Sequence, residues 1–345
     1  MKALQLSEIG KMQVVDLPDP TPGPGDVVIR IVATGICGSD IHGFTGENGR
    51  RVPGQVMGHE SAGVIEALGN DVHGLQVGAP VTFNPVIVPE EDLAEFEGRE
   101  QMCPRKTVIG VAPTFTSSFA QQIVVPVRNV IPLPEGMPLA LGALVEPLAV
   151  ATHAVRRAGV TPEDAVLVTG GGPIGQSVVL ALQMAGVTNI AVTEMSAIRR
   201  ELVQTLGAVA LPADDPDVAS HVHEALGGPA DVAIDAVGVE ATLHLALTST
   251  HAGSTVCLVG MGLPDVSLKA FEISTQERSL VGSFVYTAQD FRDAAARIGD
   301  EPDKAQRLIS REVPLAEGPT AFSELAYGEN PAGKVLVRLD VEADA

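Results

Sequence analysis

The stretch AVLVTGGGPIG, residues 165–175, joins a short apolar run to a cluster of glycines. An apolar run that ends in glycines and leads into a segment with helical periodicity indicates a buried strand, a tight turn and a helix. Gly170, Gly172 and Gly175 have the spacing GxGxxG. Between a strand and a helix, this spacing predicts a turn whose backbone approaches a pyrophosphate at the positive end of the helix.

The next apolar run carries an acidic residue at its end. Glu194 closes the run IAVTE, 19 residues after Gly175. A carboxylate at this position accepts hydrogen bonds from the adenosine ribose and repels a 2′-phosphate, so the pattern favours NAD over NADP. Arg199 lies close enough in sequence to neutralise such a phosphate, and NADP is therefore the less favoured cofactor rather than an excluded one. We expect the following residues to contact the cofactor: Gly170, Gly172, Pro173, Ile174, Gly175, Glu194 and Arg199.

The character of the sequence changes near residue 150. Before it, short alternating stretches such as DVVIRIVATG (residues 26–35) are separated by glycine and proline, which predicts a loop-rich β region. From about residue 164, short apolar runs alternate with helix-period segments, which predicts a parallel sheet with crossover helices. After about residue 287 the pattern is mixed again. We therefore expect an α/β plus β fold with segments 1–150, 151–287 and 288–345.

Composition excludes several classes of partner. The formal net charge of −21 argues against nucleic acid or an anionic membrane surface, because both require basic patches. No run of 18 apolar residues appears, so we expect no membrane span, and the N-terminal stretch has no apolar core typical of a signal sequence. The three cysteines are odd in number and far apart, which predicts a reducing, cytoplasmic location.

One of these cysteines lies among polar residues. Cys37 is part of GICGSDIHG (residues 35–43), with a hydroxyl, a carboxylate and an imidazole close by. Further along, His59 and Glu60 lie in GHESAG, and Glu146 lies in LVEPLA. A thiolate, an imidazole and one or two carboxylates suit zinc, and three protein ligands with an open position are typical of a catalytic site. The long spacing does not by itself distinguish a metal site from unconnected polar residues.

Five stretches of the chain, in order, resemble the zinc-dependent medium-chain alcohol and polyol dehydrogenases. They are GICGSDIH (residues 35–42), GHESAG (58–63), EPLAV (146–150), VTGGGPIG (168–175) and AGKVLV (332–337). The resemblance covers nearly the whole chain. It implies a chaperonin-10-like (GroES-like) catalytic β domain interrupted by a Rossmann doubly wound parallel sheet, with the active site in the cleft between them.

The resemblance also implies a set of zinc ligands. Cys37 and His59 are expected to bind the metal. Glu60 is expected to be either a third ligand, as in the polyol branch, or a nearby carboxylate that can swing onto the metal. Glu146 stands where the alcohol branch has a ligand cysteine, and it is either the fourth ligand or the group that holds a zinc-bound water.

The same resemblance implies roles for the residues around Cys37. Asp40 is expected to orient the ligand histidine from behind. Ser39 and His42 are expected to be the two ends of a proton relay that passes through the nicotinamide ribose. The implied reaction is oxidation of an alcohol, with hydride transfer to NAD.

The acidic stretch near residue 95 departs from the family pattern. Many relatives hold a structural zinc with C-x2-C-x2-C-x7-C, and the corresponding positions here are Pro89, Asp92, Glu95 and Cys103. Proline has no side-chain ligand atom, and lone carboxylates are poor substitutes for thiolates at zinc. We therefore expect one catalytic zinc per chain and no structural zinc.

The substrate is the least determined part of the prediction. Glu146 favours the sorbitol, butanediol and threonine dehydrogenase branch, in which sorbitol-type enzymes carry an Arg-Tyr pair for sugar hydroxyls. The counterpart here is Val285-Tyr286, which keeps the tyrosine and loses the charge, so a smaller diol, a cyclitol or another secondary alcohol is favoured over a full sugar alcohol. We expect a homodimer or homotetramer, because relatives commonly associate through edge strands of the Rossmann domain.

Two other interpretations stay open. A metal-free reductase of the quinone- or enoyl-reducing branches would lack Cys37, His59 and Glu60, which are present. A non-catalytic NAD-binding sensor on the same scaffold would be free to lose Ser39 or His42, which are also present. Both interpretations are therefore disfavoured.

Overall fold

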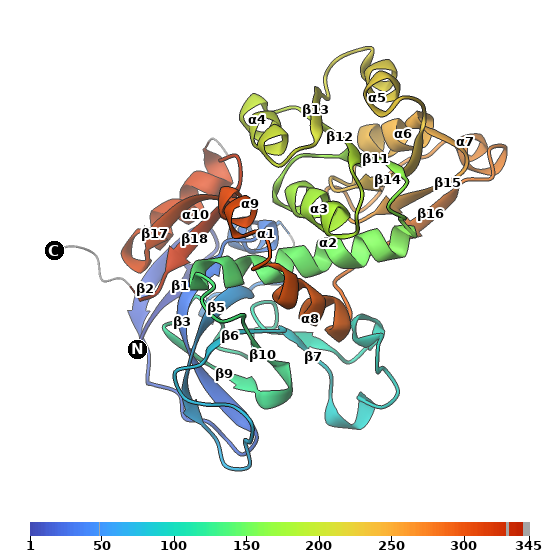
Figure 1. Cartoon of the computed structure of the whole chain (residues 1–345). Helices are drawn as coiled ribbons and strands as arrows, with labels where there is room; N and C mark the ends of the chain where they lie inside the picture. Colours follow the sequence, from blue (N-terminus) through green and yellow to red (C-terminus); the bar gives the residue numbers. More distant parts are fainter. Residues whose placement is uncertain (48, 329–330, 341–345) are drawn as a thin grey trace. The chain divides into compact units, whose positions relative to one another are not determined.

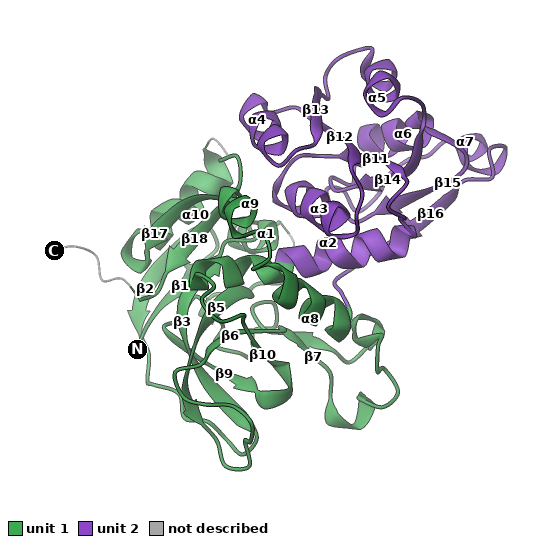
Figure 2. Cartoon of the chain, in the orientation of Figure 1, with its two compact units in different colours: residues 1–146, 287–345 green, residues 147–286 purple. Residues whose placement is uncertain are grey.

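The computed structural model of the chain describes residues 1–47, 49–328 and 331–340. The chain divides into two compact units, and Figure 2 shows them in different colours. Unit 1 contains residues 1–146 and 287–345, and unit 2 contains residues 147–286. Unit 2 is thus an insertion into unit 1.

Unit 2 is built on a six-stranded parallel sheet with the strand order β13-β12-β11-β14-β15-β16 (Figure 1). Its strands are β11 (Ala165–Thr169), β12 (Asn189–Glu194), β13 (Val209–Pro212), β14 (Ala230–Asp235), β15 (Thr250–Leu258) and β16 (Ser279–Gly282). The helices of this part of the chain are α2 (Val145–Ala158), α3 (Pro173–Met184), α4 (Ala197–Thr205), α5 (Val218–Leu226), α6 (Glu240–Ser249) and α7 (Ala270–Ser274). Because the central strands are covered by helices on their faces, most of their side chains are apolar and buried.

The turn between β11 and α3 depends on glycine. Gly170 has φ of 95°, a conformation that favours glycine, and a Cβ there would overlap the Val237 side chain. Gly172 is the N-cap of α3 and Pro173 occupies its first turn, where the missing N–H of proline costs nothing. The stretch 165–175 is therefore a strand, a tight turn and a helix, as its pattern predicted.

The described residues of unit 1 form three antiparallel or mixed sheets. A six-strand path runs β10-β6-β5-β3-β18-β17, with β9 also paired to β3; smaller sheets are β2-β1-β4 and β7-β8. The strands are β1 (Lys2–Glu8), β2 (Lys11–Asp16), β3 (Asp26–Gly35), β4 (Gln55–Val56), β5 (Glu60–Leu68), β6 (Pro80–Phe83), β7 (Val86–Ile87), β8 (Thr107–Val108), β9 (Gln122–Pro126), β10 (Val130–Pro132), β17 (Ile309–Pro314) and β18 (Lys334–Arg338). β18, the last strand among the described residues, therefore lies beside β3, which precedes Cys37.

The helices of unit 1 are short. They are α1 (Gly38–Thr45), α8 (Ala288–Arg297), α9 (Pro302–Arg307) and α10 (Gly318–Tyr327), with 3₁₀ turns at 90–92, 100–102, 127–129, 139–144 and 315–317. Phe44 on α1 packs against Phe322 with ring centroids 5.7 Å apart, and Phe322 packs edge-on against Phe119 at 5.4 Å. This aromatic cluster fixes α1 in the core, and α1 carries Ser39, Asp40 and His42.

The helical stretch Leu139–Ala158 is long and apolar enough to cross a membrane by length and composition alone, with a mean hydropathy of 1.3. A helix of this kind was not expected from the sequence. Of its most apolar window, 67% is buried inside the structure. Burial of this extent is typical of the core helix of a folded domain.

Candidate metal centre and cofactor loop

Strand pairing brings the predicted zinc ligands together. β3 and β5 are antiparallel neighbours, and Gly35 at the end of β3 is paired with Glu60 at the start of β5. Cys37 follows two residues after Gly35, and His59 immediately precedes Glu60. One ligand atom from each of Cys37, His59 and Glu60 lies within 4.8 Å of the others. The arrangement offers a thiol, an imidazole and a carboxylate to one ion.

The carboxylate of Glu60 occupies space that a glycine leaves free. A Cβ at Gly35 would overlap Glu60 Oε2. Glu60 is 0% exposed, and its Oε2 has no hydrogen-bond partner among the described residues. A buried carboxylate oxygen without a partner is costly. Its lone pairs are available to a cation at this position.

Asp40 lies directly behind His59. One oxygen of Asp40 accepts a hydrogen bond from the Cys37 backbone N–H at 3.1 Å, and the other, Oδ1, lies 3.8 Å from His59 Nδ1. Burial alone lowers the pKa of His59, but the charges of Asp40 and Cys37 outweigh burial and raise this pKa to about 10. The site therefore favours positive charge, which a metal ion supplies once the imidazole has lost its proton.

Two cations beside this cluster were not predicted. Lys334, the first residue of β18, forms a buried ion pair between its Nζ and Glu60 Oε1. Burial lowers the pKa of Lys334, but the charges of Glu60 and Cys37 outweigh it and hold this pKa above its usual range. The signal in the sequence was a lysine that opens the apolar strand KVLV.

The second cation is Arg51, whose side chain is 1% exposed. Arg51 Nη2 lies 3.9 Å from Asp40 Oδ1, and its Nη1 donates to the Val111 carbonyl at 3.4 Å. In the sequence, Arg51 stands beside Arg50 in a polar loop, and no pattern distinguishes the buried arginine from the exposed one.

The predicted relay residues lie on one helix. Ser39 is half-buried and His42 is exposed, three residues apart on α1, a spacing that makes side chains neighbours on a helix surface. His42 Nδ1 lies 2.6 Å from Glu47 Oε2. Ser39 is thus the inner member of the pair and His42 the outer one, which is the order that a relay to solvent requires.

Glu146 is placed differently from the other three predicted ligands. Its negative charge is close enough to contribute to the raised pKa of His59, although less than Asp40 and Cys37 do. It is not a member of the three-residue cluster. A direct and a water-mediated role for Glu146 both stay predictions.

The cluster fits zinc on its donor chemistry. It provides three protein ligands of the types that catalytic zinc prefers, with a carboxylate behind the histidine. The unpartnered Glu60 Oε2 gives the site an atom that needs a cation. Cys37, His59 and Glu60 would hold the ion.

The acidic lobe near Cys103 is held by an ion pair. Asp92 accepts hydrogen bonds from Arg105 Nε at 2.6 Å and from Arg105 Nη2, and the Cys103 thiol lies 3.6 Å from the same carboxylate. Arg105 also donates to Glu91 at 2.8 Å. Arg105 thus pairs with Asp92, one of the four positions that the structural-zinc pattern compares, and the absence of a structural zinc stays a prediction.

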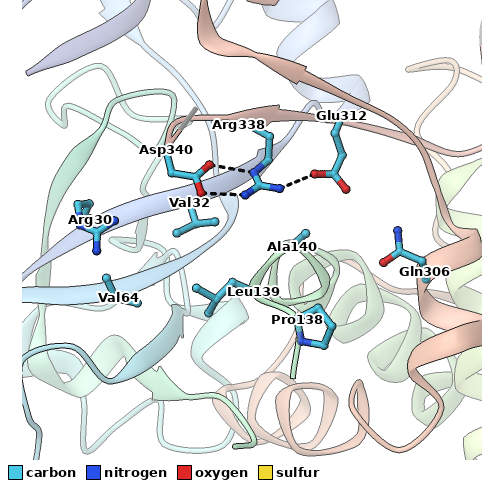
Figure 3. A pocket seen from close by; sticks show the side chains of 10 residues that line it. All are labelled: Arg30, Val32, Val64, Pro138, Leu139, Ala140, Gln306, Glu312, Arg338 and Asp340. Carbon is cyan, nitrogen blue, oxygen red and sulfur yellow. Dashed lines mark hydrogen bonds and ion pairs between the residues drawn. The ribbon is translucent and has the colours of Figure 1, made fainter. Parts of the chain in front are cut away.

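A cavity of about 540 Å³ lies elsewhere in unit 1. Figure 3 shows the side chains that line it. Its most prominent charged group, Arg338, is already bonded to Glu312 at 2.7 Å and to Asp340 at 2.8 Å. Arg30 at its edge is bonded to Glu66 at 3.0 Å. Because these charges are paired within the protein, the cavity lacks the unpartnered groups that distinguish the metal centre.

The residues predicted to contact the cofactor lie at or just after the carboxyl ends of β11 and β12 in unit 2. Glu194 Oε2 accepts a hydrogen bond from the Gly171 N–H, and Oε1 accepts one from the Ser196 N–H, both at 2.8 Å. A Cβ at Gly172 would lie 3.7 Å from Arg199 Nη1, so the arginine lies over the glycine turn. Glu194 therefore also fixes the turn itself, a role that the sequence did not predict.

Two parts of the chain match models of known protein families. Residues 23–135 match the family described as alcohol dehydrogenase GroES-like domain, and residues 173–300 match the family described as zinc-binding dehydrogenase. A sorbitol dehydrogenase of Arabidopsis thaliana is 38% identical over 77% of this chain and 76% of its own length. A sorbitol dehydrogenase of Ovis aries is 31% identical over 96% of this chain and 94% of its own.

Solved structures give the same result. A zinc-binding dehydrogenase from Sinorhizobium meliloti, bound to NADP, has a TM-score of 0.89 and 30% identity, covering 98% of this chain and 99% of that one. The 2R,3R-butanediol dehydrogenase of Bacillus subtilis has a TM-score of 0.88 and 27% identity, with the same coverage of both chains.

The chain belongs to the zinc-dependent medium-chain dehydrogenase family. Within that family it falls in the polyol dehydrogenase branch. The predicted fold class, a GroES-like β domain with a Rossmann sheet, is confirmed, as is the prediction of an oxidoreductase with zinc and NAD(H). Oxidation of a polyol or diol by a zinc dehydrogenase is the reaction class that this membership defines.

Proposed function

We propose that the protein oxidises a secondary hydroxyl of a small diol, cyclitol or related alcohol to a ketone, with NAD as the hydride acceptor. The observation that carries the proposal is the convergence of Cys37, His59 and Glu60 ligand atoms within 4.8 Å of one another. When bound, zinc supplies a Lewis acid that acidifies the alcohol, and NAD supplies the hydride acceptor.

The chain's own residues bind the metal, orient its histidine ligand and transfer the proton. Cys37, His59 and Glu60 hold the metal, and Asp40 orients His59 from behind. Ser39 accepts the proton of the substrate hydroxyl, and His42, which is exposed on the same helix, passes it to solvent. The turn at Gly170 to Gly175 would hold the cofactor, and Glu194 would accept hydrogen bonds from its ribose.

Two features support the narrower choices. Val285 stands where sorbitol-type enzymes carry an arginine for sugar hydroxyls, and the neighbouring Tyr286 is only 1% exposed. Both observations favour a substrate smaller than a sugar alcohol. Glu194 favours NAD, because its carboxylate repels a 2′-phosphate.

We also propose a cytoplasmic homodimer or homotetramer that associates through unit 2. β16 is an edge strand of the parallel sheet, and Leu280 on it is 37% exposed. Phe271 nearby in the sequence is 79% exposed. An edge strand with exposed apolar side chains is a ready pairing surface. The three cysteines are free, which supports a reducing compartment.

The test follows NADH absorbance while the protein is mixed with secondary alcohols, diols, cyclitols and sugar alcohols. Each substrate is tested with NAD and with NADP, before and after chelation. We expect activity with small diols or cyclitols and NAD that disappears on chelation and returns with zinc. Activity that survives complete metal removal would contradict the roles of Cys37 and His59. A protein that binds zinc and NADH but oxidises none of the panel would favour a sensor.

The relay is tested separately by Ser39→Ala. We expect kcat to fall roughly 10² to 10⁴-fold, the usual contribution of positioned acid–base catalysis, with zinc content unchanged. Zinc analysis and steady-state kinetics measure the two quantities. A wild-type rate in this variant would exclude the relay.

A further inference from the structure

Arg51 is a buried guanidinium with few partners. Its side chain is 1% exposed, and its Nε and Nη2 atoms have no hydrogen-bond partner within the described part of the chain. The remaining nitrogen, Nη1, makes one long bond to the Val111 carbonyl at 3.4 Å. Burial of an arginine in this way is expensive unless an anion compensates it.

The anion that faces Arg51 is Asp40. Arg51 Nη2 lies 3.9 Å from Asp40 Oδ1, and the same oxygen lies 3.8 Å from His59 Nδ1. All three atoms lack hydrogen-bond partners among residues 1–47, 49–328 and 331–340. Both distances exceed hydrogen-bonding range, but at such separations opposite charges attract strongly in a buried site. The three side chains form a row, Arg51–Asp40–His59.

The histidine at the end of this row faces the metal ligands. One ring nitrogen of His59 lies within 4.8 Å of the ligand atoms of Cys37 and Glu60. The Nδ1 atom, 3.8 Å from Asp40 Oδ1, has no hydrogen-bond partner in the part of the chain that the structure describes. Nδ1 is directed to Asp40, and Nε2 is left to the cluster of ligand atoms.

The fold reserves space for this arginine. Gly43 lies on α1, and a Cβ at that position would overlap Arg51 Cγ. α1 also carries Asp40, so a single helix supplies both the carboxylate and the gap through which the arginine passes.

We propose that Arg51 is a positioning residue for the metal centre, which holds Asp40 against His59 and so fixes the imidazole that binds zinc. The inference rests on the proposed zinc site. Removal of a partner behind a ligand histidine typically weakens metal binding 10- to 100-fold, because the ring loses its fixed orientation. Arg51 acts on His59 only through Asp40. We therefore expect its removal to weaken metal binding by the lower end of that range, about tenfold.

The experiment compares Arg51→Met, Arg51→Lys and Arg50→Met in the full chain. Arg50 is the matched control, because it is the adjacent arginine in the sequence but is exposed. Zinc affinity is measured by competition with a chromophoric chelator, and melting is followed by circular dichroism. We expect Arg51→Met to bind zinc roughly tenfold more weakly, Arg51→Lys to recover most of the loss, and Arg50→Met to match the wild type.

A second readout separates positioning from general stability. In the zinc-loaded protein with ¹⁵N-labelled histidine, we expect a sharp, solvent-protected Nδ1–H resonance for His59. The resonance should broaden or disappear in Arg51→Met and persist in Arg51→Lys. If Arg51→Met does not fold, Gly43→Ala displaces the arginine without removing its charge and should weaken zinc binding in the same direction.

The possible results distinguish the inference from the function on which it rests. Wild-type protein that binds no zinc would overturn the proposed function. Wild-type protein that binds zinc, with an unchanged affinity and an unchanged His59 resonance in Arg51→Met, would overturn only the role of Arg51. A lower melting temperature with unchanged zinc affinity would show that Arg51 is merely structural, and would also overturn it.

Discussion

Two cysteines of unit 1 have similar neighbours and opposite environments. Cys103 lies beside Asp92, which is bonded to Arg105 at 2.6 Å in a half-exposed lobe. Cys37 lies near Asp40, whose nearest arginine is 3.9 Å away and almost completely buried. Thiol, carboxylate and guanidinium are present in both places.

The two places differ in which polar groups have hydrogen-bond partners within the protein. In the lobe, the carboxylate of Asp92 is saturated by Arg105. In the centre, Asp40 Oδ1, His59 Nδ1 and Glu60 Oε2 are buried and have no hydrogen-bond partner among the described residues. A cation added to the lobe would have to displace an arginine, whereas a cation added to the centre would satisfy groups that are otherwise costly. Unpartnered buried groups thus mark the functional site better than residue types do.

The largest expected effect is that of Cys37→Ala, and Cys103→Ala is its comparison. Cys37→Ala removes a metal ligand, and we expect loss of bound zinc and a fall in kcat/KM of roughly 10⁴-fold, since the metal contributes several kcal/mol. Cys103→Ala should keep full zinc content. Atomic absorption and steady-state kinetics on both variants measure the effects. Equal zinc content in the two variants would contradict the prediction that Cys37 binds zinc and Cys103 does not.

The next effect concerns the buried ion pair between Lys334 and Glu60. Lys334→Met leaves a buried carboxylate without its partner, and we expect the free energy of unfolding of metal-stripped protein to fall by about 3 to 5 kcal/mol. Zinc should restore part of the loss, because it neutralises Glu60. Urea denaturation with and without zinc tests this expectation. A zinc-independent loss would mean that Lys334 does not share Glu60 with the metal.

The third cysteine serves as a reference that belongs to neither site. Burial raises the pKa of Cys257 to about 11, partly offset by Arg157. Because the unfolded thiol ionises near its ordinary value of 9.0, the thiol contributes stability below pH 9 that is lost as the pH rises to about 11. We expect this loss to be roughly 1 to 2 kcal/mol and to vanish in Cys257→Val. Urea denaturation at pH 8 and pH 10.5 compares the two proteins, and an identical pH dependence would contradict the assignment.

The smallest effect belongs to the lobe. Arg105 is half-exposed, so solvent screens its ion pair with Asp92. We expect Arg105→Met to change the melting temperature far less than Lys334→Met and to leave zinc content unchanged. Parallel melting curves of the two variants give the comparison. A loss as large as that of Lys334→Met would show that the lobe is structurally as important as the centre.

Part of this architecture could be predicted from local sequence. The strand, turn and helix at residues 165–175 follow from the apolar run, the glycines and Pro173. Such patterns are readable because the residues that interact are close together in the chain. The predicted ligands Cys37, His59 and Glu60 depended on the family resemblance, and their roles stay predictions although the structure brings them together.

The two cations show what local sequence cannot give. Lys334 reaches Glu60 only because Leu336 in β18 is paired with Gly35 in β3, and no sequence pattern specifies that register. Arg51 is buried because Gly43 leaves room for it, a steric fact that composition does not report. Glu194 was expected on the ribose, and its second role in bonding the Gly171 N–H depends on the closeness of two backbone segments.

The pairing of Lys334 with Glu60 has a consequence for synthesis of the protein. The two residues are 274 positions apart, so the ribosome synthesises Glu60 and the other predicted ligands long before it synthesises Lys334. At roughly 5 to 20 residues per second, the interval is on the order of 15 to 50 s. During that interval the nascent thiol and carboxylates have no resident ammonium beside them. The charge of Glu60 is balanced by Lys334 only after β18 has paired with β3.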